Sequence, residues 1–298
     1  MAGRVAIIGG SLRGSPRDTN SNAREPNTQE HDAHDHDTRS EKQHRAPRYA
    51  FRAFREIAAR LREAENRVLL LDLDGTLARL RRRPEEVRVS ARAKRTLEKL
   101  AALPNMTVAI LSGRNVSTLE KLVDVKSLRY FGLHGSESDR SSASISGEAR
   151  KALTRAKRSA RQELAGFSGV DIEDKGCGFT VHYRGADPAA IRGANQTLLA
   201  IVAPLRHALH VLNGKKVWEV LPRQIPGKGS AMKKLMAASP SAALAYIGDD
   251  EPDEPAFAVL DGHVTIHVGK NENTHARFYL RNPGEVLRFL SMIEKELR

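Results

Sequence analysis

The chain has 298 residues, 40% of them hydrophobic, which is enough to bury one sizeable core and a second, smaller one. Its single cysteine, Cys177, excludes an intramolecular disulfide framework. No apolar stretch approaches the roughly 20 residues that a membrane span needs, and the N-terminus lacks the apolar core of a signal peptide, so we expect a soluble, cytoplasmic protein.

The formal net charge of +13 raises the question of a nucleic-acid partner, which depends on where the charge lies. The segment from Arg45 to Lys99 holds 16 Lys and Arg against 8 Asp and Glu. Around Arg79–Arg83 these charges stand without interleaved stacking aromatic residues. We interpret the segment as a solvated basic face that attracts anionic substrates and expect no nucleic-acid partner; a nucleic-acid-binding factor that uses the basic N-terminal region is the alternative from a different class.

Residues 1–47 are expected to form a disordered tail, because residues 15–47 have almost no large apolar side chain to offset the entropy of ordering. Within the tail, Val5–Ser15 resembles the start of a flavodoxin-like nucleotide-binding domain, but no second strand–helix unit follows it. The segment His31–Asp37 combines histidine and aspartate, but a flexible tract lacks the surrounding hydrogen bonds that fix ligand geometry. We therefore assign neither a flavin site nor a metal site to the tail.

The next elements are a predicted helix over Tyr49–Ala64 and an apolar strand over Val68–Leu71. The strand stops on Asp72-Leu73-Asp74-Gly75-Thr76, which places two carboxylates one residue apart. An open α/β sheet binds its ligands beyond the carboxyl ends of its strands. The pattern therefore predicts a phosphoryl-transfer site at this strand end.

The remaining parallel elements repeat the same arrangement of a buried strand followed by polar residues. They are a helix from Ser90 to about Leu103, a strand Met106–Leu111 ending on Ser112-Gly113-Arg114, a helix Val116–Val123, a strand Ala243–Ile247 ending on Gly248-Asp249-Asp250, a strand Val264–Val268 and a helix Pro283–Leu297. Parallel strands whose carboxyl ends share one crevice explain the repetition, so we predict a Rossmann-like α/β core.

A segment with a different order of predicted helices and short strands separates the second strand from the third. It is predicted as a helix (Glu148–Ala165), two strands (Val170–Ile172 and Gly178–Tyr183), a helix (Pro188–Ala203) and two strands (Ala208–Leu212 and Lys216–Leu221). Consecutive short strands indicate an antiparallel α+β module. We therefore expect a core of residues 48–138 and 222–298 with an inserted α+β cap domain over residues 139–221.

These motifs resemble two nested families. Asp72-x-Asp74, Ser112, Lys228 and Gly248-Asp249-Asp250 with Asp253 stand in the order of the four motifs of haloacid-dehalogenase-type phosphatases. Further stretches resemble the trehalose-6-phosphate phosphatases more specifically: Gly132–Gly135, Glu173–Gly176, His182–Arg184, Gly214–Val220, Lys228-Gly229 and Gly248–Phe257. The resemblance covers about Arg67–Arg298 and includes no glucosyltransferase domain, so we expect no bifunctional synthase-phosphatase.

The resemblance implies a role for each core residue. Asp72 is the expected nucleophile, and Asp74 the general acid and then the general base. Thr76 and Ser112 are expected to donate hydrogen bonds to the phosphoryl oxygens, and Lys228 to supply a fixed positive charge. Mg²⁺ is the expected cofactor, with ligands from Asp72, the Asp74 carbonyl and Asp249. For Asp250 and Asp253 two roles stay open: holding a metal-bound water or orienting Lys228.

Substrate contacts are expected mainly from the cap. By resemblance, Glu173, Lys175 and Glu219 hydrogen-bond the hydroxyls of the glucose farther from the phosphate, while Gly113 and Arg114 contact the substrate from the core. His134 and His182 are interpreted as structural histidines. The sequence departs from the family pattern at Glu251-Pro252, at Pro255 and at Cys177-Gly178.

The resulting expectation is Mg²⁺-dependent hydrolysis of trehalose 6-phosphate to trehalose and phosphate through an aspartyl phosphate, as part of trehalose biosynthesis. The alternatives are another sugar-phosphate phosphatase of the same architecture, acting on sucrose phosphate or mannosyl phosphoglycerate, and a phosphomutase. The oligomeric state stays open, and a monomer is compatible with the sequence.

Overall fold

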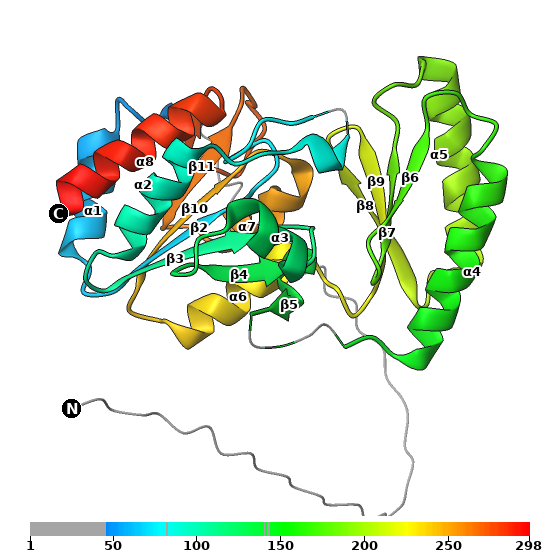
Figure 1. Ribbon diagram of the computed structural model, residues 1–298, viewed down its shortest axis with the longest axis horizontal. Coiled ribbons are helices and arrows are strands. Elements are labelled where there is room, and N and C mark those ends of the chain that lie inside the picture. The colour runs from blue at the N-terminus through cyan, green and yellow to red at the C-terminus, as the bar shows by residue number, and fades with distance from the viewer. Residues whose placement is uncertain (1–45, 82, 140, 142–143) are drawn as a thin grey trace, which may run out of the picture. The chain divides into compact units, whose positions relative to one another are not determined.

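The computed structural model describes residues 46–81, 83–139, 141 and 144–298. The expectations for Val5–Ser15 and His31–Asp37 lie outside these residues. Within them the strands form two sheets (Figure 1). The larger has the order β1 (Arg48–Tyr49), β12 (Phe278–Leu280), β11 (Val264–Val268), β10 (Ala243–Gly248), β2 (Arg67–Leu71), β3 (Met106–Leu111), β4 (Arg129–Gly132) and β5 (Glu137–Ser138). The smaller has the order β6 (Asp171–Asp174), β7 (Phe179–His182), β9 (Val217–Pro222) and β8 (Leu209–Gly214).

All neighbours in the larger sheet are parallel except β4 and β5, which pair antiparallel. Its central strands β10, β2 and β3 are apolar and almost entirely buried, as expected where helices cover both faces of a sheet. The predicted parallel α/β architecture is therefore confirmed. Because these three strands are neighbours and point the same way, the residues that follow them meet at one edge of the sheet.

The side chains of each central strand alternate between two hydrophobic cores. In β2, Leu69 and Leu71 pack on one face, and Val68 and Leu70 pack on the other. The first face is covered by α1 (Phe54–Glu63), α2 (Ala91–Ala101), α3 (Val116–Val123) and α8 (Pro283–Leu297). The second is covered by α6 (Lys228–Ala238) and α7 (Glu254–Val259). We call this sheet with its helices the core.

The antiparallel sheet lies between β5 and α6 in the chain and carries α4 (Gly147–Glu163) and α5 (Pro188–Val202) on one face (Figure 1). Phe179, Val181, Trp218 and Val220 form its buried interior with these helices. Because side chains alternate along a strand, the residues between them point to the other face. On that face Thr180 lies opposite both Glu173 and Glu219. We call this sheet with α4 and α5 the cap.

The first predicted helix is wrong at its start, because it begins at Phe54 rather than Tyr49. Arg48 and Tyr49 instead pair with β12, and the Tyr49 hydroxyl donates to Glu285 Oε1 at 2.9 Å. Several short elements were not predicted: β4, β5, β12, α7 and the 3₁₀ helices η1 (Pro84–Glu86), η2 (Leu133–Gly135), η3 (Ala203–Leu205) and η4 (Glu251–Asp253). The strands and helices that frame the site agree with the predicted ones to within a few residues.

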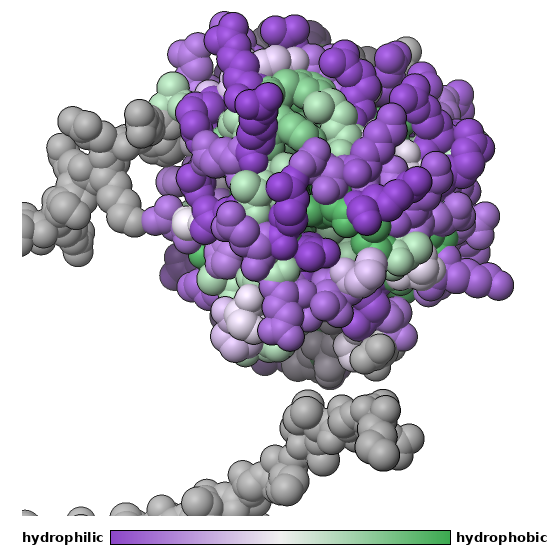
Figure 2. Space-filling view, turned by 90° about the vertical axis from the view of Figure 1, so that its left-hand side faces the viewer, coloured by the Kyte–Doolittle hydropathy of each residue, from purple (hydrophilic) through white to green (hydrophobic). Residues whose placement is uncertain are grey.

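The outer surfaces of the helices are polar. Arg55, Arg60 and Arg62 are exposed on α1, as the basic segment predicts. Figure 2, which views this side of the molecule, shows a mostly hydrophilic surface with hydrophobic residues in small separate groups. Among the described residues, no helix combines the length and the apolarity that a membrane crossing requires.

Candidate active site

Three polar residues follow the three central strands of the core. Asp72 follows β2, Ser112 follows β3 and Asp249 follows β10, and all three are buried. The strand hydrogen bonds continue through the first two, since Asp72 N donates to Ile247 O at 2.9 Å and Ser112 N donates to Phe131 O at 3.0 Å. The sheet itself therefore fixes the backbone beneath these side chains.

Lys228, the first residue of α6, lies between two of the buried carboxylates. Its Nζ donates to Asp72 Oδ1 at 2.8 Å and to Asp253 Oδ1 at 2.6 Å. Asp253 also accepts the Tyr246 hydroxyl, and its Oδ2 accepts the backbone N–H groups of Asp249 at 2.9 Å and residue 250 at 3.0 Å. Asp253 thus makes the contact with Lys228 that one of its two predicted roles requires.

Three carboxylates form a compact cluster at this point. Asp72, Asp249 and Asp253 each offer an oxygen, and these oxygens lie within 4.8 Å of one another. Lys228 pairs with Asp72 and Asp253, and the Lys215 ammonium lies 3.4 Å from Asp249 Oδ2, so one negative charge is left uncompensated when all three carboxylates are ionised. Oxygen ligands of this kind suit a hard divalent cation.

The electrostatics of the cluster agree with a missing positive charge. Burial, together with repulsion from Asp253 and Asp249, raises the pKa of Asp72 well above its usual range despite Lys228. Burial and the charge of Asp253 raise the pKa of Asp249 to about 7. For Asp253, by contrast, the adjacent Lys228 outweighs burial and lowers the pKa. A divalent cation beside Asp72 and Asp249 would favour the ionised form of both.

The turn after β2 contacts the carboxylate of Asp249 and helps to hold it in place. Gly75 has φ of +88°, and a Cβ added there would lie 2.0 Å from Asp249 Oδ2. Only glycine therefore fits this position. Thr76 is fully buried, and its hydroxyl donates to Asp249 Oδ1 at 3.4 Å. Thr76 supports a carboxylate of the cluster and is not among the residues that line the pocket.

Asp74 lies apart from the cluster and pairs with Arg114. Arg114 donates from Nε to Oδ2 at 2.6 Å and from Nη2 to Oδ1 at 2.9 Å. Burial opposes the charge of Arg114, but Asp74 outweighs it and raises the pKa of the guanidinium. Asn115 makes this turn possible, because its side chain accepts Thr118 N at 2.9 Å and so begins α3 directly after Arg114.

The cap contributes two acidic side chains, each paired with a histidine. Glu173 Oε2 accepts from His182 Nε2 at 2.9 Å, and its Oε1 lies 3.0 Å from Lys175 Nζ. Burial alone would raise the pKa of Glu173, but His182 and Lys175 outweigh it and lower the pKa. Glu219 Oε2 accepts from His134 Nε2 at 2.7 Å. Burial would also raise the pKa of Glu219, yet His134 and the more distant lysines lower it to about 2.

His134 comes from the core and has a constrained setting. Its φ of +55° is rare for a residue with a side chain, and its Nδ1 is buried without a hydrogen-bond partner among the described residues. Gly113 lies against the ring, since an added Cβ would be 2.9 Å from His134 Cε1. The interpretation of His134 and His182 as structural histidines is therefore incomplete, because each one also fixes a pocket glutamate.

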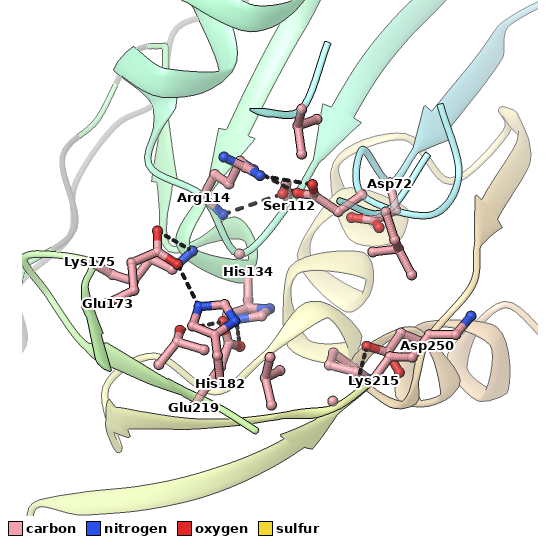
Figure 3. Close-up of a pocket in the computed structure, with 18 of the residues that line it drawn as sticks. Asp72, Ser112, Arg114, His134, Glu173, Lys175, His182, Lys215, Glu219 and Asp250 are labelled. Carbon is pink, nitrogen blue, oxygen red and sulfur yellow. Dashed lines mark hydrogen bonds and ion pairs between the residues drawn. The ribbon is translucent and has the colours of Figure 1, made fainter. Parts of the chain in front are cut away.

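The structure brings most of the predicted residues together in one pocket between core and cap (Figure 3). Its lining includes Asp72, Asp74, Ser112, Gly113, Arg114, Glu173, Lys175, Glu219, Lys228 and Asp250. Asp249 and Asp253 lie beneath it, next to Asp72. Asp250 points away from the cluster, because its oxygens accept the N–H groups of Lys215 at 2.6 Å and Glu251 at 2.9 Å.

Some pocket residues were not predicted. Thr180 lines the pocket and donates to Glu219 Oε1 at 3.4 Å, and strand alternation from His182 could have found it. Lys215 and Arg81 also line the pocket. Lys215 lies within the resembling stretch Gly214–Val220, but no role was predicted for it; Arg81 belongs to a run of basic residues, and no pattern distinguishes it from a solvated surface charge.

Comparison with known sequences gives a consistent result. The sequence profile of the trehalose-phosphatase family matches residues 70–283. A trehalose-phosphate phosphatase of Mycobacterium tuberculosis is 31% identical over 255 residues, which cover 79% of this chain and 63% of that protein. The chain thus spans less than two thirds of the length of this relative.

Comparison with solved structures identifies the fold. The C-terminal domain of C. albicans trehalose-6-phosphate phosphatase has a TM-score of 0.72 at 23% identity, over 84% of this chain and 98% of that one. A haloacid dehalogenase-like hydrolase from Bacteroides thetaiotaomicron has a TM-score of 0.56 at 13% identity, over 76% and 99%. At such identities these likenesses establish the fold alone, and they confirm a Rossmann-like core of the haloacid-dehalogenase type. Since the family profile matches well over half of the residues, the chain belongs to the trehalose-phosphatase family.

Proposed function

We propose that this chain hydrolyses trehalose 6-phosphate to trehalose and inorganic phosphate, with Mg²⁺ bound and with phosphorylated Asp72 as intermediate. The observation that carries the proposal is a single pocket that Asp72 and Lys228 line from the core and Glu173 and Glu219 line from the cap. The first pair suits phosphoryl transfer, and the second suits recognition of sugar hydroxyls.

We also propose a division into domains. Residues 48–138 and 222–298 would form the core, residues 139–221 the cap and residues 1–47 a tail. The two separate sheets support this division, and the proposed second boundary falls at Pro222, the last residue of β9.

The cation would be held by Asp72 and Asp249, and Asp253, whose oxygen lies within 4.8 Å of theirs and accepts the Lys228 ammonium, would lie beside it. The resemblance adds the backbone carbonyl of Asp74. A bound Mg²⁺ would supply positive charge next to the phosphate and so relieve its repulsion from these carboxylates. The uncompensated charge of the cluster and the raised pKa of Asp249 support such an occupant.

In the first step, an oxygen of Asp72 attacks phosphorus while the bond from phosphorus to the sugar oxygen breaks. Asp74 gives its proton to the departing sugar oxygen, which leaves as a hydroxyl group. Lys228 and the Ser112 hydroxyl are proposed to stabilise the charge on the phosphoryl oxygens. Lys228 is well placed for this role because Asp253 holds its ammonium 2.8 Å from Asp72 Oδ1.

In the second step, Asp74 acts as a base. It takes a proton from a water molecule that attacks the phosphorus of phospho-Asp72. The bond between the Asp72 oxygen and phosphorus breaks, phosphate is released and the carboxylate of Asp72 is restored. Arg114, which holds both oxygens of Asp74, would keep this carboxylate directed at the reacting groups.

The cap would supply specificity. Glu173, Lys175 and Glu219 are proposed to hydrogen-bond hydroxyls of the glucose farther from the phosphate, and Gly113 and Arg114 to contact the nearer part of the substrate. Polar groups paired to hydroxyls reject a substrate that lacks those hydroxyls by a large factor, because the unpaired groups would stay buried.

The test is phosphate release by the full chain with and without Mg²⁺. The substrate panel contains trehalose 6-phosphate, sucrose 6-phosphate, glucose 6-phosphate and mannosyl phosphoglycerate. We expect Mg²⁺-dependent turnover with a kcat/KM for trehalose 6-phosphate at least about 100-fold above the others. Equal turnover across the panel would refute the specificity, and conversion to an isomeric sugar phosphate would indicate a phosphomutase.

A further inference from the structure

The cap contacts the core at the turn between β8 and β9. The backbone N–H of Lys215 donates to Asp250 Oδ2 at 2.6 Å. Gly214 lies against the same oxygen, since an added Cβ would be 3.2 Å from it. Figure 3 shows Lys215 and Asp250 facing each other at one end of the pocket, with Glu173 and Lys175 at the other.

An arginine secures the same turn from the cap side. Arg184, which follows β7, donates from Nη2 to Lys215 O at 3.3 Å and from Nη1 to Arg81 O at 3.3 Å. Arg81 belongs to the core segment between β2 and α2. The turn at Lys215 is therefore joined to the core directly through Asp250 and indirectly through Arg184.

The carboxylate of Asp250 is fully engaged in these contacts. Its Oδ1 accepts Glu251 N at 2.9 Å, which fixes the side chain at the start of η4, and its Oδ2 accepts Lys215 N. The cluster with cation-ligand spacing contains Asp72, Asp249 and Asp253 instead. Asp250 thus follows a cluster carboxylate in the chain but directs its own oxygens to backbone N–H groups.

We propose that Asp250 and the Lys215 N–H form a latch that holds the cap closed over the catalytic residues, an inference that rests on the proposed function. The bond exists only while the turn lies on the core. Glu219 lies on β9, four residues after Lys215. The latch therefore helps to fix the position of Glu219 relative to Asp72. Asp250 is then a positioning residue that acts through the cap.

Two variants remove the two halves of the bond. Asp250→Ala removes the acceptor, and Lys215→Pro removes the donor at a position whose φ is not positive. A matched control preserves the bond: Lys215→Ala keeps the N–H while removing the ammonium that lies 3.4 Å from Asp249 Oδ2.

The first measurement does not depend on activity. Hydrogen exchange of the peptide over residues 212–217 is followed in the full chain with Mg²⁺ present. We expect exchange in Asp250→Ala to be about tenfold faster than in the unmodified chain and exchange in Lys215→Ala to stay close to that of the unmodified chain, because a hydrogen bond to a charged acceptor is worth a factor of about ten or more. Unchanged exchange in Asp250→Ala would overturn the latch.

The second measurement is kinetic. In Asp250→Ala and Lys215→Pro, kcat/KM for trehalose 6-phosphate should fall about 10- to 100-fold, and the double variant should fall no further. Hydrolysis of p-nitrophenyl phosphate, which offers the cap no sugar, and the half-saturating Mg²⁺ concentration should stay within about twofold of the values for the unmodified chain.

A rise of about tenfold in the half-saturating Mg²⁺ concentration would instead make Asp250 a ligand, and equal kinetics for Lys215→Pro and Lys215→Ala would refute the role of the N–H. Should the unmodified chain release no phosphate from trehalose 6-phosphate, the proposed function fails, while hydrogen exchange still decides the latch.

Discussion

Arg114 holds Asp74 by two parallel hydrogen bonds, of 2.6 Å from Nε and 2.9 Å from Nη2. The two residues follow neighbouring strands, β2 and β3, whose parallel register brings the turns together. The carboxylate proposed to carry the proton is thus fixed in one plane by a planar guanidinium. Orientation of Asp74 therefore depends on a residue whose predicted role was contact with the substrate.

Replacing Arg114 should consequently impair the chemical step. We expect Arg114→Ala to lower kcat about 10- to 100-fold, since two hydrogen bonds between charged groups are lost. Arg114→Lys should recover only part of this, because an ammonium cannot make the same planar pair. Steady-state kinetics with trehalose 6-phosphate give kcat and KM separately. An effect on KM alone, or full recovery by lysine, would contradict the orienting role.

A second prediction concerns Lys228 as the counter-charge of the cluster. Lys228→Met should destabilise the metal-free protein by about 3–5 kcal/mol, because buried carboxylates lose the cation between them. Added Mg²⁺ should restore part of the loss by binding to the folded state. Urea unfolding in EDTA and in Mg²⁺ measures both effects. Lys233→Met, at an exposed position of the same helix, is the matched control and should change stability by less than about 0.5 kcal/mol.

The sequence allowed the core and the reacting residues to be predicted because both follow from local patterns. Val68–Leu71 is a continuous apolar run and Met106–Leu111 is apolar except at Thr107, and such runs are recognisable wherever a strand is buried on both faces. β1 could not be predicted, since Arg48–Tyr49 becomes a strand only by pairing with Phe278 and Tyr279, far away in the chain. Its strand conformation is a consequence of tertiary contact rather than of local preference.

The side-chain pairs of the site were likewise beyond local patterns. Asp74 with Arg114 and His134 with Glu219 join residues 40 and 85 positions apart. Their partners depend on how the strands are ordered and on how the cap lies over the core. The contact of Asp250 with Lys215 is of the same kind, which explains why two roles for Asp250 stayed open in the sequence.

A third prediction concerns Asp72, which should be essential for turnover yet costly for stability. Asp72→Asn should reduce phosphate release at least about 1,000-fold, because an amide cannot form the acyl phosphate. The pKa of Asp72 is raised in the folded state, so its ionised form destabilises the fold at neutral pH. Without Mg²⁺ the variant should therefore melt at a higher temperature than the unmodified chain at pH 8, and the difference should shrink as the pH is lowered and Asp72 takes up a proton. Substantial residual turnover would overturn the assignment of the nucleophile.

A fourth prediction uses two glycines with similar backbone conformations. Gly75 and Gly262 have φ of +88° and +91°, but only at Gly75 would an added Cβ meet the Asp249 carboxylate. Gly262→Ala should cost about 1–2 kcal/mol of backbone strain and leave kcat unchanged. Gly75→Ala should add to that strain a displacement of Asp249, with loss of Mg²⁺-dependent activity. Urea unfolding and phosphate release compare the two variants, and similar activity in both would show that the contact with Asp249 is unimportant.

The last prediction is a dependence of stability on pH that arises from Glu219. Its pKa is lowered from 4.5 to about 2 in the folded state by His134, against the effect of burial. A carboxyl group with a depressed folded-state pKa contributes stability that is fully present above pH 4.5 and is lost as the pH falls toward 2. The shift corresponds to about 3 kcal/mol in total, of which about 2 kcal/mol is lost by pH 3.

Glu219→Gln lacks this titration, so the stability advantage of the unmodified chain over the variant should narrow by about 2 kcal/mol between pH 6 and pH 3. The measurement is urea unfolding of both proteins at several pH values, without Mg²⁺. Asp171→Asn is a suitable control, because Asp171 is an exposed carboxylate on β6 of the same sheet, and its substitution should leave the pH dependence as it is. A constant difference between the unmodified chain and Glu219→Gln across this range would mean that His134 does not stabilise the charge of Glu219. The hydrogen bond of 2.7 Å between them would then contribute geometry to the pocket without contributing electrostatic stability.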